Sequence, residues 1–357
     1  MHVLLSHSKF AGSRYYRMEE PVRAVLDAGV GITAELRYGL PTTMSGPAKL
    51  ASSEVLAVDA GDADVVVLQL PKTKAQLDMV RVLQAQGVAV VVEMDDLFSD
   101  VAYGHLGYRV LTKANVDKWA RACAREADFV TVSSQLLLEE YAPHGRGMVI
   151  PNAMPRRNVE LPPAYERETD VVTVGWTGSV ASHPYDLQVM ESGLQRALDD
   201  HPGRSRFAIL GQAFDARKRL FLKDDPLEIS WIKSVDEYVA AIGEVLDVGV
   251  APLRVDRFNT AKSWLKVMEY SGRGVFSVRS ATAEYERLGL GMRAKRPRDW
   301  AAHLSRAIGD ADFRRETAAA AHQEVLAKHL TEHTAELWAT AWRRAADNRA
   351  RSRRIGA

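Results

Sequence analysis

Two lysines and a glutamate lie at spacings that suit a phosphate-binding site. Lys262 and Lys266 are four residues apart and Glu269 follows three later, so a helix would carry them near one face. Ammonium groups can bind a diphosphate, and a carboxylate can accept hydrogen bonds from ribose hydroxyls. A solvated lysine–glutamate face is the usual meaning of this spacing. Because the segment follows an apolar APL and precedes another apolar run, we interpret it as a nucleotide site that includes Ser263.

A glycine-rich segment, GWTGSVASHPYDL, follows the apolar run VVTV. Gly175, Gly178 and Ser179 can turn tightly and expose backbone N–H groups, and we expect a helix to begin near Asp186. Such a loop can receive a phosphate. The alternative is that the glycines only allow the chain to turn, and this is the commoner reason for so short a motif.

Adjacent carboxylates end another apolar run, VAVVVEMDD. Glu93, Asp95 and Asp96 would lie at the end of a buried strand, where unpaired carboxylates are costly unless they are functional. We expect Asp95 or Asp96 to orient or deprotonate an acceptor hydroxyl. The alternative is a helix N-cap beside a solvated neighbour.

Short β-branched runs alternate with helical segments along the chain, which predicts parallel sheets built from βαβ units. The segment between two of these runs repeats Leu77, Val80 and Leu83 on one helical face and ends at Gly87, so it is a predicted crossover helix. Ser234 and Glu237 form a predicted capping box. The predicted strands are 3–5, 65–70, 88–94, 129–133, 171–176, 207–210, 247–253 and 275–278.

A proline-rich, charged stretch at 151–170 contains four prolines and no apolar periodicity. It predicts neither a regular helix nor a central strand, and strand–helix alternation resumes directly after it. We interpret it as a boundary between two Rossmann-like domains; a surface loop within one domain is the alternative. The predicted divisions are an acceptor-side domain at 1–155, a linker at 156–170, a nucleotide-sugar-binding domain at 171–330 and a C-terminal helix with a basic tail at 331–357.

The composition predicts a globular protein. The chain has 357 residues, of which 46% are hydrophobic, a formal charge of +1 and no apolar run long enough to span a membrane. We expect a cytoplasmic protein without an integral membrane segment. The single cysteine, Cys123, excludes an internal disulfide and is predicted to be buried. Six arginines and one acid fall between Arg343 and Arg354, which predicts a basic, frayed terminus.

An ordered set of segments resembles the GT4-like glycosyltransferases of the GT-B fold. The segments are ADFVTVSSQLLLEEY, VIPNAMP, VGWTGSVASHPYDL, DVGVAPL and FNTAKSWLKVMEYSGRGV, and the likeness runs from about residue 60 to a helix near Trp338. The resemblance implies an α/β GT-B fold, in which two Rossmann-like domains face each other across a cleft. It also implies a C-terminal helix that packs back toward the N-domain.

The resemblance assigns the donor site residue by residue. Gly178 and Ser179 would lie against the donor phosphates, and Glu269 would bind the ribose. Lys262 and Lys266 would lie near the diphosphate, where Lys266 would act in catalysis by offsetting the charge on the leaving nucleotide.

On the N-terminal side, the resemblance places Asn152 at the crossing between domains and the early loop, Gly12 to Arg17, at the cleft. Asp95 and Asp96 stand where many relatives have a His-Asp pair, so Asp95 would contact the sugar or acceptor.

Two departures from the family pattern affect this assignment. Ala261 lies eight residues before Glu269, where the family has the other glutamate of a pair, and that missing glutamate usually contacts the donor sugar. The Arg and Lys that usually follow the Gly-Ser strand are also missing, and His183 lies in that stretch. Lys262, Lys266, Arg14 or Arg17 would then supply the positive charge, and Arg17 is counted among the donor-binding residues.

The implied reaction moves a sugar from a nucleoside-diphosphate sugar to an acceptor hydroxyl, with retention and without a metal or other cofactor. The acceptor could be a glycan, a small molecule, a protein or, less favoured, DNA, to which the arginine-rich tail could bind. A membrane surface or an acidic partner would suit this tail as well. Alternatives for the function are a catalytically inactive GT-B binding protein, a DNA-modifying glycosyltransferase, an epimerase and a phosphorylase. An epimerase would need further acidic groups in the cleft, and a phosphorylase would need a pyridoxal lysine in a much longer chain; neither is visible in the sequence.

Overall fold

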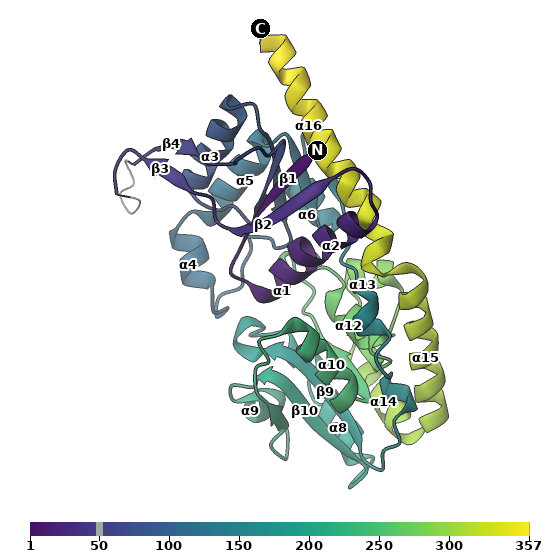
Figure 1. Ribbon diagram of the computed structural model, residues 1–357. Coiled ribbons are helices and arrows are strands. Elements are labelled where there is room, and N and C mark those ends of the chain that lie inside the picture. The colour runs from purple at the N-terminus through teal and green to yellow at the C-terminus, as the bar shows by residue number, and fades with distance from the viewer. Residues whose placement is uncertain (48–52, 357) are drawn as a thin grey trace.

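Two parallel six-stranded sheets form the centres of two α/β lobes in a computed structural model of the chain (Figure 1). The structure describes residues 1–47 and 53–356. All pairings within both sheets are parallel, as the alternation of strands and helices predicts.

The first sheet has the order β2-β1-β5-β6-β7-β8. Its central strands are runs of valine and other apolar residues because helices cover both faces. The strands are β1 (His2–His7), β2 (Thr33–Tyr38), β5 (Val65–Gln69), β6 (Ala89–Met94), β7 (Phe129–Val132) and β8 (Gly147–Val149). A separate antiparallel pair joins β3 (Thr42–Met44) to β4 (Val55–Val58).

The second sheet has the order β11-β10-β9-β12-β13-β14. Its strands are β9 (Val172–Ser179), β10 (Ser205–Gln212), β11 (Leu227–Ile229), β12 (Val248–Ala251), β13 (Phe276–Ser280) and β14 (Met292–Ala294). All eight strands expected from the sequence are present. The edge strands β2, β11 and β14, together with β3, β4 and β8, were not expected, because they are short or carry polar residues.

The first lobe's helices include the expected crossover, α3 (Lys74–Ala85). Its N-cap is Thr73, it buries Leu77, Val80 and Leu83, and it ends just before Gly87, whose φ is 89°. The others are α1 (Ala11–Arg14), the π-helix η1 (Tyr15–Glu19), α2 (Glu20–Asp27), α4 (Tyr108–Lys113), α5 (Val116–Glu126) and α6 (Gln135–Tyr141).

The second lobe's helices cover both faces of its sheet. Ser234 caps α10 by accepting a hydrogen bond from the N–H of Glu237, as the sequence predicts. The helices are α8 (Gly193–Asp199), α9 (Ala216–Leu220), α10 (Val235–Val245), α11 (Arg257–Thr260), α12 (Leu265–Gly272), α13 (Ala283–Leu288), α14 (Pro297–Gly309) and α15 (Ala311–Lys328). Short 3-10 turns are η3 (Val180–Ser182), η4 (Leu187–Met190) and η5 (Thr331–Thr334).

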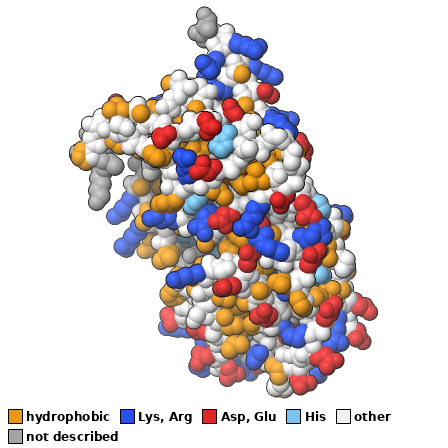
Figure 2. Space-filling view, in the orientation of Figure 1, with side chains coloured by type: hydrophobic (Ala, Val, Ile, Leu, Met, Phe, Trp, Pro, Cys, Tyr) orange, Lys and Arg blue, Asp and Glu red, His pale blue; other side chains and the backbone are white. Residues whose placement is uncertain are grey.

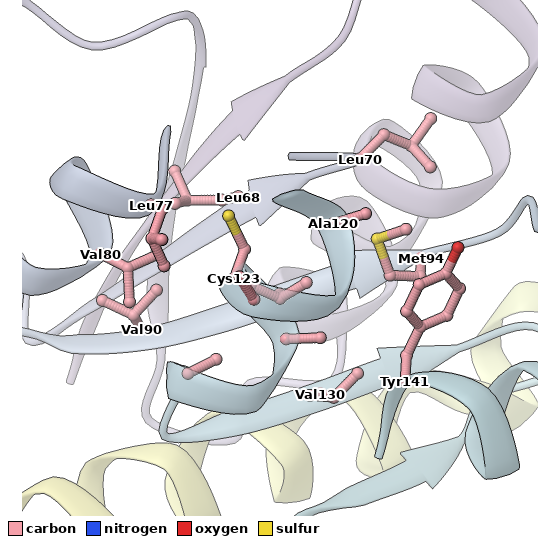
Figure 3. Close-up of a cluster of buried hydrophobic side chains, with 14 of the residues drawn as sticks. Leu68, Leu70, Leu77, Val80, Val90, Met94, Ala120, Cys123, Val130 and Tyr141 are labelled. Carbon is pink, nitrogen blue, oxygen red and sulfur yellow. The ribbon is translucent and has the colours of Figure 1, made fainter. Parts of the chain in front are cut away.

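Cys123 lies in the hydrophobic core of the first lobe, as predicted. Figure 3 shows its side chain on α5 facing the apolar residues of α3 and the sheet, including Leu77 and Val80. Burial raises the pKa of this thiol to about 12. The group is therefore a neutral core residue rather than a nucleophile.

Two local predictions were wrong. The proline-rich stretch holds a short helix, α7 (Arg156–Val159), and a 3-10 turn, η2 (Ala164–Glu166), whose N-cap residues are Pro155 and Pro163. The early segment, expected to be a loop, is helical from Ala11. The helix expected near Asp186 is the 3-10 turn η4, with Asp186 as its N-cap, and the α-helix α8 starts only after Glu191, whose φ is 44°.

The C-terminal helix α16 (Ala335–Gly356) packs back on the first lobe (Figure 1). Trp338 and Trp342 are buried against that lobe. Arg343 donates to the carbonyl of Val30, and Asn348 donates to the carbonyl of Asp128. The terminus is thus a docked helix rather than a frayed tail, and arginine side chains gather at its exposed end (Figure 2).

Candidate functional site

A cavity of about 320 Å³ opens between the two lobes. It lies beyond the carboxyl ends of both sheets, where doubly wound folds bind ligands. The first lobe contributes Ala11, Gly12, Ser13, Tyr16, Asp95, Asp96 and Asn152. The second contributes Gly178, His183, Leu210, Gly211, Ser230, Trp231, Ile232, Lys233, Val235, Tyr238, Leu253, Lys262, Ser263, Leu265, Lys266, Glu269 and Tyr285.

Lys266 on α12 is held against the end of β9. Its Nζ donates to the carbonyl and the hydroxyl of Thr177 at 2.5 and 3.2 Å, and it lies 5.0 Å from the ring centre of Trp176. Burial, with a contribution from Lys262, lowers the pKa of this lysine to about 8, while Glu269 opposes the decrease. Gly178 follows Thr177 with a φ of 130°, and a Cβ there would lie 3.1 Å from the ring of Trp176, so this position favours glycine.

Glu269, one turn along α12, holds two tyrosine hydroxyls. Tyr16 from the first lobe donates to Oε1 at 2.8 Å, and Tyr238 from α10 donates to Oε2 at 3.2 Å. Burial raises the pKa of Glu269, while Lys266 opposes this rise. The carboxylate therefore sits in the cavity wall with hydroxyl donors already on it, an arrangement that paired sugar hydroxyls can reproduce.

Asp95 and Asp96 follow β6 on the opposite wall. Burial, with Asp96 and Glu93 close by, raises the pKa of Asp95 to about 7, and its Oδ1 has no hydrogen-bond partner among the residues that the structure describes. Asp96 lies 3.7 Å from Nζ of Lys262, which connects the two lobes across the cavity. A carboxyl group balanced near neutral pH can donate to or accept from a sugar or acceptor hydroxyl.

Arg17 lies behind the cavity rather than on its wall. Its Nε and Nη2 donate to Glu93 at 2.6 and 3.2 Å, and its Nη1 donates to the carbonyl of Ile150 at 2.6 Å. The guanidinium also lies 4.7 Å from the ring centre of Trp338 on α16. The side chains of Arg17 and Glu93 are almost completely buried. The pair therefore joins η1, the first sheet and the C-terminal helix.

Asn152 connects this buried pair to the cavity. Its Oδ1 accepts from Arg17 at 3.1 Å, and its Nδ2 donates to the hydroxyl of Ser263 at 2.8 Å. Its carbonyl accepts from Trp264 at 3.0 Å. The residue expected at the crossing between domains thus positions the segment that carries both lysines.

The structure brings most of the predicted site residues together. Those on the cavity wall are Asp95, Asp96, Gly178, Lys262, Ser263, Lys266 and Glu269. Ser179 and Arg17 are not among the lining residues, and the hydroxyl of Ser179 is buried without a partner in the part of the chain that the structure describes. Lys262 does not lie on α12, because α11 ends at Thr260 and α12 begins only at Leu265. It reaches the cavity from the intervening turn.

Sequence reasoning missed several of the lining residues. Tyr16 and Tyr238 complete the environment of Glu269, and the segment 230–233 between β11 and α10 forms one end of the cavity. The adjacent pair Tyr15 and Tyr16 was the available signal for the first lobe. The segment 230–233 carries no pattern that points to a ligand.

Within residues 1–47 and 53–356, no cluster of three or more His, Cys, Asp or Glu side chains is arranged to hold a metal ion. The same part of the chain contains no helix whose length and apolar character would let it cross a bilayer.

Known proteins resemble this chain in structure but not detectably in sequence. No family model matches it, and no curated protein matches it in sequence. HepE from Anabaena, solved with UDP and glucose, is 14% identical with a TM-score of 0.61, over 95% of this chain and 98% of HepE. WaaG, a glycosyltransferase involved in lipopolysaccharide biosynthesis, is 12% identical with a TM-score of 0.57, over 95% of this chain and 98% of WaaG.

A third match is TarM from S. aureus, solved with UDP and a GlcNAc-glycerol compound. It is 11% identical with a TM-score of 0.57, over 79% of this chain and 56% of TarM. Identity at this level shows the fold alone. Together with the two parallel sheets, the cavity between them and the returning C-terminal helix, these matches show that the chain has the GT-B fold.

Proposed function

We propose that this protein is a glycosyltransferase that moves a sugar from a nucleoside-diphosphate sugar to an acceptor hydroxyl. The observation that carries the proposal is the convergence of Lys262, Lys266 and Glu269 on one cavity between the lobes. HepE and TarM, which share the fold, were solved with UDP. Their ligands, together with the two lysines and the glutamate on the cavity wall, support a nucleotide-sugar donor.

In the proposed complex, the ribose hydroxyls donate to Glu269 in place of the tyrosine hydroxyls. The diphosphate lies between Gly178 and the ammonium groups of Lys262 and Lys266. The nucleobase occupies the end of the cavity formed by 230–233, where the half-exposed Trp231 offers an aromatic face.

The same side chains account for the chemistry. As the bond from the anomeric carbon to the diphosphate breaks, negative charge grows on the leaving phosphate, and the two lysines stabilise it without a requirement for a metal. Asp95, with its pKa near 7, hydrogen-bonds a hydroxyl of the sugar or the acceptor. We assign a retaining, GT4-like reaction, supported by the resemblance of the C-terminal motifs. A further structural match, trehalose-6-phosphate synthase, is 14% identical with a TM-score of 0.57 and was studied for glycosyl transfer with retention.

Release of the nucleotide from a panel of sugar donors tests the proposal. UDP-glucose, UDP-N-acetylglucosamine, ADP-glucose, GDP-mannose and dTDP-glucose would each be incubated with the wild-type protein, with and without a mixture of glycan acceptors. We expect one nucleotide to be released, and Lys266→Met to slow its release. Tight nucleotide binding without turnover would identify a binding protein, and absence of binding by all five would refute the proposal.

A further inference from the structure

His183 is a cavity residue that the proposed reaction does not yet use. It follows η3, and its ring packs edge-on against Trp176 at 5.5 Å between ring centres. Its Nδ1 lies 2.7 Å from Oδ2 of Asp186. The other oxygen of Asp186 accepts from the backbone N–H of Arg254 at 3.0 Å and from Nδ2 of Asn259 at 2.7 Å. The carboxylate is therefore fixed by three donors.

These contacts decide where the histidine carries its proton. Although burial works to raise the pKa of Asp186, hydrogen bonds from His183 and from Arg254 hold it below its ordinary value. An ionised carboxylate can only accept, so Nδ1 of His183 carries the proton and Nε2 of the neutral ring has a free lone pair. Nε2 makes no hydrogen bond to any residue within the described ranges and is not enclosed by protein, so it is available to a ligand in the cavity.

Burial favours the neutral form of this ring, and two cations add to the effect. Burial lowers the pKa of His183 to about 4, Lys262 and Lys266 contribute to the decrease, and the hydrogen bond to Asp186 opposes it. A neutral ring with its lone pair toward the ligand would repel a phosphate oxygen. An anion beside the same lysines cancels their repulsion of the ring, and its own charge favours an imidazolium.

We propose that His183 is a ligand of the donor diphosphate, and that it takes up one proton from solvent at Nε2 when the diphosphate binds. This inference rests on the proposed function, since it needs a diphosphate in the cavity. The protonated ring donates from Nε2 to a phosphate oxygen and from Nδ1 to Asp186, so the imidazolium stays paired on both sides. The proton returns to solvent when the nucleotide leaves, and no other bond changes.

The charges around the ring come from several elements. The charged groups that face it or the same cavity are Asp186 in its own loop, Lys233 before α10, Lys262 before α12, Lys266 and Glu269 on α12, and Asp95 and Asp96 across the cavity. Two of these can also change protonation near neutral pH, because Asp95 has a pKa of about 7 and Lys266 one of about 8. The measurement must therefore separate proton uptake by His183 from proton uptake by Asp95 and by Lys266.

Calorimetric titration in buffers of different ionisation enthalpy counts the protons taken up on binding. The probes are UDP-glucose, ADP-glucose, GDP-mannose and dTDP-glucose, whose phosphates are diesters that do not titrate near neutral pH. At about pH 7 we expect His183→Gln to take up about one proton fewer than the wild-type protein and to bind more weakly. The same difference should appear when both proteins also carry Asp95→Asn, which removes the contribution of Asp95. Lys266→Met alone should retain the uptake by His183.

Equal proton uptake by the wild-type protein and His183→Gln would overturn the inference while leaving the proposed function intact. Failure of all four probes to bind the wild-type protein would instead refute the proposed function. Nitrogen-15 NMR of histidine-labelled wild-type protein observes the proton directly, and the signal missing from His183→Gln identifies the resonance among the ten histidines. The Nε2 resonance of His183 should change from the unprotonated to the protonated range on saturation, and an unchanged resonance in the complex would contradict the inference.

Discussion

Replacement of Arg17 by methionine tests whether this arginine supports the site or binds the donor. Methionine keeps much of the length and apolar contact of the side chain but removes the guanidinium. Glu93 then loses two hydrogen bonds, at 2.6 and 3.2 Å, and retains the hydroxyl of Thr131 as a donor. The carbonyl of Ile150 and the amide oxygen of Asn152 also lose a partner.

The expected cost follows from burial, since both members of the Arg17–Glu93 pair are almost completely enclosed. Removal of one partner from a buried ion pair costs about 3–5 kcal/mol, because the remaining charge is left without compensation. We therefore expect Arg17→Met to lower the free energy of unfolding by about 3–5 kcal/mol. Arg14→Met is the matched control, because Arg14 and Glu19 form a partly exposed pair worth about 1 kcal/mol or less.

Urea denaturation followed by circular dichroism measures these differences. The double variant Arg17→Met/Glu93→Gln should recover part of the loss, since no charge is then buried alone. If Arg17→Met changed the free energy of unfolding by less than about 1 kcal/mol but weakened nucleotide binding, the structural role would be wrong. Arg17 would then be a donor ligand, as the sequence predicts.

Three further predictions concern the cavity. Glu269→Gln should weaken nucleotide binding about tenfold to a hundredfold in calorimetry, because hydrogen bonds to a charged acceptor contribute about 1.5–3 kcal/mol; unchanged affinity would exclude a ribose contact. Lys266 has a pKa of about 8, so it loses its proton above that pH, and we expect the Kd for the nucleotide to rise more steeply there in the wild-type protein than in Lys266→Met, in which proton uptake by His183 remains. Gly211→Ala places a Cβ 2.1 Å from the carbonyl oxygen of Gly178 and should destabilise the protein to urea far more than Gly203→Ala, which has a positive φ but no atom within 4 Å.

The sequence predicts the central parts of both sheets because their strands are continuous apolar runs, such as 65–70 and 171–176. It also predicts α3, where apolar periodicity, a capping residue and Gly87 agree. The edge strands β11 and β14 could not be predicted, since each has three residues and takes its conformation from the neighbouring strand.

The site could be predicted only in part, because some of its contacts join residues that are far apart in the sequence. Lys262, Lys266 and Glu269 are close in sequence, so their spacing reveals them. Tyr16 reaches Glu269 only because a π-helix and the packing of the two lobes bring residues 253 positions apart together. Neither the spacing of polar residues nor their type contains that information. Arg17 belongs to the same π-helix, and its partners come from β6 and from the segment after β8.

A crystal structure of the protein with its preferred nucleoside diphosphate tests the central claim most directly. The proposed function predicts that the ribose hydroxyls lie on Glu269, that the phosphates lie beside Gly178, Lys262 and Lys266, and that the base lies against 230–233. A nucleotide bound outside the cavity, or one whose ribose does not contact Glu269, would contradict the assignment of this cavity as the donor site.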